Sequence, residues 1–173
     1  MVSLQVIHSE PTTEGWKDFS IPGVRNAFGY APSPANYARP FARPLSSISP
    51  TIALLNGKPY ISVSAAGGSR IITAVIQHLW HTLDQNQTSI QAQREARFHD
   101  QLSPNVVNFE WANLDVGVKG FDNRTVDYIK STGKNVTFIA PGSSSLQALR
   151  RLVNGTFEAA SEVRQANSGG LTY

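Results

Sequence analysis

The alternation of apolar and polar residues first becomes regular over residues 51–64, where two β-rich stretches flank Asn56-Gly57. An Asn-Gly pair between two such stretches is the strongest short-range signal of a β-hairpin. We therefore predict a hairpin with one alternating apolar face. The residues of that face are Ile52, Leu54, Ile61 and Val63.

Three later segments favour helices. Over residues 69–84, apolar residues recur at intervals of three and four for almost four turns, which predicts a mostly buried helix. Residues 89–98 favour a shorter helix. Residues 122–133 favour a third, with Asp122 as its N-cap and Gly133 as the residue that ends it.

Other segments favour strands. Residues 106–111 alternate apolar and polar side chains, and residues 135–141 form another apolar run. Residues 146–161 contain a second Asn-Gly pair, which predicts a hairpin, although the first seven of them also suit a helix. Because there is no βαβ alternation and no fixed repeat, we predict an α+β layered fold with mostly antiparallel strands in hairpins and about three helices.

The first 50 residues differ from the rest of the chain. Residues 1–17 are polar and patternless, and we expect a poorly ordered lead-in. Residues 20–50 hold six of the ten prolines, too many for a helix or a central strand. We therefore expect one domain over residues 18–173, in which residues 18–50 form an extended Pro-rich loop.

Composition excludes several classes of protein. A chain of 173 residues with 40% hydrophobic content fits one compact domain. Its net charge of +3 comes from scattered basic residues, with Arg150-Arg151 as the only adjacent pair, which argues against nucleic-acid binding. The sequence has no cysteine, no apolar run long enough to span a bilayer and no signal-peptide pattern at its start.

Four Asn-x-Thr sequons begin at Asn86, Asn123, Asn135 and Asn154. Composition alone gives roughly two such sequons by chance, so the excess favours a glycoprotein of the secretory route. The alternative is that they are chance sequons in loops.

Gly67-Gly68 lies where the first hairpin ends and the long helix begins. The unpaired N–H groups of a helix's first turn attract anions, and glycines leave room for one to approach. The pair can therefore hold a phosphate, a carboxylate or an oxyanion, although the lysine of a P-loop is missing. The alternative is a tight turn with no ligand.

Two other loop segments carry candidate groups. Ser46 and Ser47 lie between prolines and can present hydroxyl and main-chain donors to a carboxylate, or they can form an ordinary turn. Asp18 is a loop carboxylate that would be an ordinary surface acid in most proteins.

For several residues that could take part in catalysis or metal binding, we expect structural roles instead. His78 and His81 have the spacing of a metal pair, but no third ligand is visible nearby, so we expect a polar helix edge. For Arg70 we expect packing or a salt bridge. Trp80 and Trp111 are predicted core residues.

Taken in order, these segments resemble the small subunit of the γ-glutamyltransferases, also called glutathione hydrolases. The sequences of the motifs are most similar to those of fungal members. The resemblance runs from Asp18 to the C-terminus. It also covers His99, in a segment whose role in the family looks structural. The matching motifs are DFSIPGVRNAFGYAPSPAN, RPLSSISPTI, AAGGSRIIT, EARFHDQ and FEAASEVRQANSGG.

The resemblance implies part of the αββα sandwich of an N-terminal-nucleophile hydrolase. It implies that Asp18 holds the substrate's α-amino group, that Ser46 and Ser47 hold its α-carboxylate, and that the amides of Gly67 and Gly68 form the oxyanion hole. The implied reaction transfers a γ-glutamyl group from glutathione to water, amino acids or peptides, without a metal or organic cofactor. The implied partner is the family's large subunit, through which the chain would be extracellular or membrane-associated.

The family's Gly-x-Thr-Thr-His stretch, which carries the threonine nucleophile, lies roughly forty residues before the acid matched by Asp18, and this chain has only seventeen residues there. Thr12 and Thr13 lack the following histidine and are poor substitutes. We therefore expect a family enzyme that is present as a fragment without its nucleophile. The alternatives are a catalytically dead γ-glutamyl-binding module and an assembly partner of a large subunit.

Overall fold

The computed structural model describes residues 2–6, 18–26 and 29–172. The chain divides into two compact units, one formed by Met1–Ile7 with Ile48–Tyr173 and the other by His8–Ser47. Most of the predicted lead-in, residues 7–17, lies outside the described residues, whereas Val2–Val6 form a strand, β1, that pairs with β2.

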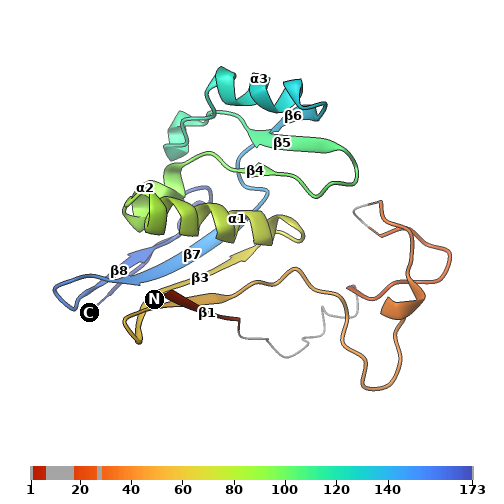
Figure 1. The fold of residues 1–173 in the computed structure, drawn as a ribbon, viewed down its shortest axis with the longest axis horizontal. Helices are drawn as coiled ribbons and strands as arrows, with labels where there is room; N and C mark the ends of the chain where they lie inside the picture. Colours follow the sequence, from red (N-terminus) through yellow and green to blue (C-terminus); the bar gives the residue numbers. More distant parts are fainter. Residues whose placement is uncertain (1, 7–17, 27–28, 173) are drawn as a thin grey trace. The chain divides into compact units, whose positions relative to one another are not determined.

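The larger unit is built around a five-stranded sheet (Figure 1). Its strand order is β1-β2-β3-β7-β8, and every neighbouring pair is antiparallel. Hairpins therefore make up most of it, as predicted, and the segment that also suited a helix is strand β7. The strands after β1 are β2 (Thr51–Leu55), β3 (Lys58–Ala66), β7 (Ser145–Arg151) and β8 (Phe157–Ala160).

The β2–β3 hairpin confirms the Asn-Gly prediction, because Asn56 and Gly57 both have positive φ angles, 52° and 76°. Two φ values of this sign are what a two-residue hairpin turn of the primed type requires. The predicted apolar face is wrong for β2, however. Ala53 pairs with Ile61 and is buried, whereas the half-buried Ile52 alternates with it on the opposite face. Leu54 shares that opposite face.

Helix α1 (Arg70–Leu79) covers one face of this sheet, and π-helix η3 (Trp80–Asp84) continues it (Figure 1). Helix α2 (Ser89–Arg94) follows, with a capping box between Thr88 and Gln91. The helices predicted at residues 69–84 and 89–98 are both present, although the second ends at Arg94. The core between α1 and the sheet contains Val63, Ile71, Ala74, Val75, Leu146, Ala148 and Ala160.

The long helix is buried on one side only, which corrects the prediction of a mostly buried helix. Ile72 and Ile76 lie on the exposed side, and Trp80 is 52% exposed on the same side. Trp111, the other predicted core tryptophan, is 49% exposed because β5 ends one residue before it. A stripe of large apolar side chains therefore faces outward from α1 and η3.

A second sheet has the strand order β4-β5-β6, from β4 (Phe98–His99), β5 (Val106–Glu110) and β6 (Asn135–Ile139). β5 and β6 are parallel and are joined through α3 (Asn123–Ser131). The expectation of no βαβ unit is therefore wrong, because a strand, a helix and a strand predicted separately form one. Asp122 caps α3, accepting a hydrogen bond from the Arg124 N–H, as predicted.

A small core of aromatic side chains packs against this second sheet. Phe109 is buried beneath α3, where it contacts Val126 and packs edge-on against Phe121 with ring centroids 4.8 Å apart. Phe98 also meets Phe121 edge-on. These contacts hold β4, β5 and the loop before α3 together. The mixed architecture confirms the predicted α+β class.

A buried network of ion pairs joins the two sheets of the larger unit. The Arg97 guanidinium donates to Glu162 at 2.8 Å, and Arg164 donates to Glu110 at 2.6 Å and to Glu162 at 3.1 Å. Burial opposes ionisation of Glu162, but the two arginines outweigh it and hold the pKa of that carboxyl below its ordinary value. The network fixes the C-terminal segment against both sheets.

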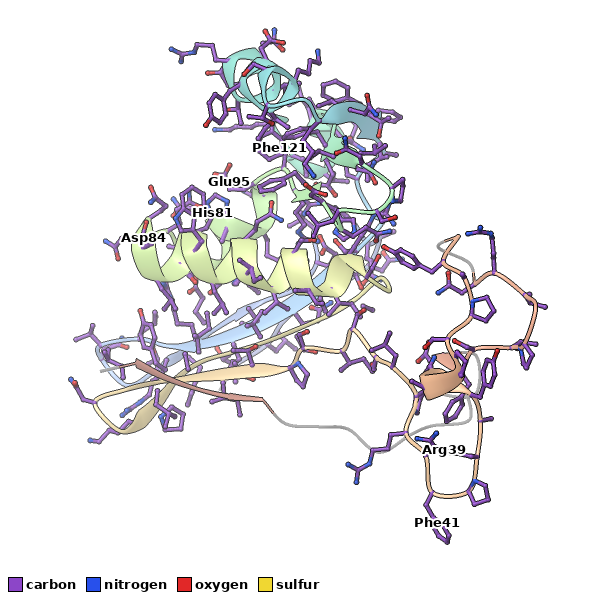
Figure 2. The ribbon with its side chains drawn as sticks, turned by 45° about the vertical axis from the view of Figure 1, so that its right-hand side comes forward. Arg39, Phe41, His81, Asp84, Glu95 and Phe121 are labelled. Atoms are coloured by element: carbon purple, nitrogen blue, oxygen red, sulfur yellow. The ribbon has the colours of Figure 1, made fainter. Side chains whose placement is uncertain are left out.

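The smaller unit contains the Pro-rich segment that we predicted as an extended loop. Its described part is mostly extended and includes a short 3-10 helix, η2 (Pro34–Asn36), and an isolated bridge between Ser20 and Tyr37. Figure 2 shows Arg39 and Phe41 on the loop that continues from η2.

Candidate functional site

Gly67 and Gly68 form the turn between β3 and α1, where the sequence predicted an anion site. Their φ angles are 131° and 62°, values that favour glycine. A Cβ atom added to Gly67 would lie 2.6 Å from the Ser143 main-chain oxygen and 2.8 Å from the Ser144 Cα. Only glycine therefore fits position 67 as the chain is folded.

The first turn of α1 closes directly on these glycines. The Arg70 N–H donates to the Gly67 carbonyl at 3.3 Å, and the Ile71 N–H donates to the Gly68 carbonyl at 3.1 Å. The N–H groups of Gly67 and Gly68 precede these first helical donors, at the positive end of the helix dipole. A helix N-terminus preceded by two glycines suits an oxyanion or a carboxylate.

The residues behind the turn are bound to the second sheet. His99 is buried and contacts the Thr73 hydroxyl through Nδ1 at 2.9 Å, and the Arg70 guanidinium donates to the Asn108 Oδ1 at 2.9 Å. Arg70 therefore binds an amide through this contact. A small cavity here is lined by Thr73, Asn108 and Ser144, among others. His99 and Arg70 tie α1 to the second sheet, so they support the turn.

The other predicted site residues belong to the smaller unit. Asp18 and Ser46 are exposed, and Ser47 is half-buried. Within this unit the structure brings the Asp18 segment and the segment before Ser46 to one residue, Asn36. The two glycines belong to the larger unit. The roles expected for these five residues stay a prediction.

Asn36 is a further candidate site residue that the sequence did not indicate. Its side-chain Nδ2 donates to the Asp18 carbonyl at 2.7 Å, and its Oδ1 accepts a hydrogen bond from the Leu45 N–H at 2.8 Å. Asn36 lies within the PSPAN motif, but nothing in its local pattern distinguishes it from other loop asparagines. The signal becomes visible only when the loop is folded.

The two histidines of the long helix do not share one environment. His78 is 2% exposed and faces the sheet, so the predicted polar helix edge is wrong at this position. His81 is partly exposed and lies with Glu95 on the side of the helices away from the sheet (Figure 2). Among the described residues, no group of three or more His, Cys, Asp or Glu side chains is placed to hold a metal ion.

Burial makes His78 a pH-sensitive element of the core. Burial, together with the nearby charge of Arg97, lowers the pKa of His78 from 6.5 to about 4. Between these two values the unfolded chain binds a proton that the folded chain does not. Stability from the neutral ring is therefore complete above pH 6.5 and is lost as the pH falls toward 4.

We expect a His78→Met variant to lose much of the pH dependence of stability in this window. The native chain should lose up to about 3 kcal/mol of unfolding free energy through His78 between pH 7 and pH 4. Urea unfolding of both proteins at pH 7 and pH 4.5 measures the difference. Equal pH dependence of the two proteins would contradict the assignment.

Solved structures share this fold. A crystal structure of Helicobacter pylori gamma-glutamyltranspeptidase matches with a TM-score of 0.75 and 31% identity, covering 88% of this chain and 80% of that chain. A structure of an acivicin-inhibited gamma-glutamyltranspeptidase matches with a TM-score of 0.74 and 32% identity, over 88% of this chain and 79% of that chain. The site therefore lies on the scaffold of an N-terminal-nucleophile hydrolase.

The sequence matches the gamma-glutamyltranspeptidase family over residues 13–171, and the chain belongs to this family. A glutathione hydrolase proenzyme of the fungus Arthroderma benhamiae is 46% identical over 155 residues, which are 89% of this chain and 25% of the relative. A glutathione hydrolase of Aspergillus flavus is 36% identical over 89% of this chain. The chain thus spans 25% of the length of these two relatives.

Proposed function

We propose that this chain forms the substrate-recognition part of an enzyme that transfers the γ-glutamyl group of glutathione to water, amino acids or peptides. The observation that carries the proposal is the Gly67-Gly68 turn, which leaves two main-chain N–H groups ahead of the first helical donors. The names of the fungal relatives, glutathione hydrolases, support the same reaction.

In the proposed reaction, a threonine hydroxyl attacks the γ-carbonyl carbon of the donor. The new C–O bond displaces the carbonyl electron pair onto oxygen, and the N–H groups of Gly67 and Gly68 stabilise the resulting oxyanion. The C–N bond then breaks, and the amine leaves with a proton. Water or a second amine attacks the acyl-enzyme and releases the γ-glutamyl group from the threonine.

Recognition of the donor is assigned to the smaller unit. The Asp18 carboxylate would pair with the α-ammonium group of the glutamyl moiety, and the Ser46 and Ser47 hydroxyls would donate to its α-carboxylate. These groups select donors in which both α-substituents are free. A γ-linked glutamyl group meets that requirement.

We assign the nucleophilic threonine to the remainder of a longer protein, since the chain spans 25% of the fungal relatives. The large subunit, also part of that remainder, would cover apolar surface on the larger unit. Ile72, Ile76 and Trp80 form an exposed stripe on α1 and η3, and such a stripe is typical of a surface that packs on another polypeptide.

A secretory location is the accompanying proposal. The four sequon asparagines are all exposed, so a glycan at any of them would project into solvent. Among the described residues, no helix combines the length and apolar character that crossing a bilayer demands. We assign any association with a membrane to the large subunit that the family resemblance implies.

The test is turnover of a chromogenic γ-glutamyl anilide by the full-length protein that contains this chain. We expect the Ser46→Ala/Ser47→Ala double variant to raise KM about 100-fold, because two hydrogen bonds to a charged carboxylate are lost. The chain alone should release no chromophore. Glutamate binding by the full-length protein without turnover would instead favour a catalytically dead binding module.

A further inference from the structure

A single side chain, Asn36, connects the two segments that carry the proposed recognition groups. Its Nδ2 donates to the Asp18 carbonyl at 2.7 Å and to the Ser20 Oγ at 3.3 Å. Its Oδ1 accepts from the Leu45 N–H at 2.8 Å, one residue before Ser46. The planar amide therefore lies between the main chain of residue 18 and the main chain of residue 45.

The main chain of Asn36 strengthens this connection. The Ser20 N–H donates to the Asn36 carbonyl at 2.9 Å, so both the side chain and the main chain of residue 36 hold the segment after Asp18. Asn36 ends the short helix η2, whose Pro34 restricts the backbone at its start. Asn36 itself is half-buried.

The chemistry of the substrate explains why such a connection matters. The α-ammonium and α-carboxylate groups of a glutamyl donor are attached to the same carbon atom. Groups that bind both must therefore keep a fixed separation, and an error of about 1 Å in position can cost on the order of 100-fold in rate. A rigid amide bonded to both segments sets that separation.

We infer that Asn36 is a positioning residue that sets the spacing between Asp18 and the Ser46-Ser47 pair, and so determines the selection of donors with both α-substituents. This inference rests on the proposed function. Asn36 acts through the main chain of its neighbours. It is distinct from the groups that touch the substrate.

Two substitutions separate the two halves of the connection. Asn36→Ala removes all three side-chain hydrogen bonds, those to Asp18, Ser20 and Leu45. Asn36→Asp retains an oxygen that accepts from the Leu45 N–H, but it replaces the donor to the Asp18 carbonyl with a second oxygen, which repels that carbonyl. The first variant releases both segments, and the second releases mainly the Asp18 segment.

The test compares kcat and KM of the full-length protein on three anilides. The γ-glutamyl anilide has both α-substituents, the glutaryl anilide lacks the amine, and the 4-aminobutyryl anilide lacks the carboxylate. We expect Asn36→Asp to reduce the preference for γ-glutamyl over glutaryl at least tenfold and to preserve the preference over 4-aminobutyryl. Asn36→Ala should reduce both preferences, mainly through KM.

Asn105→Ala is the matched control, because Asn105 donates to the Gly133 carbonyl in the other unit. This variant should leave kcat and KM for all three anilides unchanged. If both Asn36 variants change the three substrates equally, or leave them unchanged, the inference is overturned. If the Asp18→Asn and Ser46→Ala/Ser47→Ala variants also keep native preferences, the proposed function itself fails.

Discussion

Replacing Arg164 with alanine should reduce the free energy of unfolding by about 3–5 kcal/mol. The Arg164 side chain is 1% exposed and donates to Glu110, to Glu162 and to two main-chain carbonyls, those of Gln93 and Glu95. Its removal leaves two buried carboxylates short of a cation and two carbonyls without a donor. A domain of this size has only about 5–15 kcal/mol of stability, so the loss is large.

Urea unfolding followed by circular dichroism measures this effect. Arg124→Ala is the control, because its side chain is 92% exposed in an ion pair with Asp122 at the start of α3. That variant should keep the midpoint of the native chain within error. If the Arg164 variant unfolds at the same urea concentration as the Arg124 variant, the buried network contributes nothing to stability and our account of it is wrong.

The second large effect is expected at Gly67. A Gly67→Ala variant should lose about 3 kcal/mol of stability, because alanine is strained at a φ of 131° and its Cβ would overlap main-chain atoms of Ser143 and Ser144. To relieve the overlap, the turn must move, and the two amides move with it. In the full-length protein, turnover should therefore fall about 100- to 1000-fold.

Gly133→Ala provides a matched comparison. Its φ of 86° is also positive, but a Cβ there meets nothing within 4 Å. This variant should show the conformational cost alone, about 1 kcal/mol, and retain turnover. Thermal unfolding and anilide turnover of the two variants, measured side by side, decide the matter. If the two variants show equal losses of stability and of turnover, the close contact of Gly67 with Ser143 and Ser144 does not matter for function and our account of the turn is wrong.

Local signals predicted the elements well. Both predicted hairpins form. At Asn56-Gly57 both turn residues have positive φ angles, whereas at the second pair the positive φ angle is that of Gly155, 88°. The helix beginning at Arg70 followed from spacing alone. The same spacing also indicates that His78 is buried, because it lies one turn after the buried residues Ala74 and Val75.

Errors arose where burial depends on partners distant in sequence. Alternation in residues 106–111 predicted a buried Trp111, but Glu110 is buried instead, because Arg164 pairs with it. The two residues are 54 positions apart, and no local pattern indicates that pairing. The parallel contact of β5 with β6 was missed for the same reason, since each strand was recognised without its neighbour.

In the candidate site, too, the features set by local sequence were predictable, and those set by contacts between distant residues were not. The turn at Gly67 was predicted from glycines at a strand-to-helix junction, and the structure confirms that turn. The roles of Asp18, Ser46 and Ser47 came from family resemblance. Asn36 could not be predicted from local sequence, because its side-chain hydrogen bonds join it to residues 18 positions earlier and 9 positions later in the chain.

Our central proposal is that the main-chain amides of Gly67 and Gly68 bind the oxygen of the γ-carboxyl group of a glutamyl ligand, and that Ser46 and Ser47 bind its α-carboxylate. Selective ¹⁵N-glycine labelling of the full-length protein, followed by titration with L-glutamate, tests it directly. We predict saturable shifts of both glycine amide resonances, which disappear in the Ser46→Ala/Ser47→Ala variant. Bound glutamate that leaves both resonances in place would contradict the account.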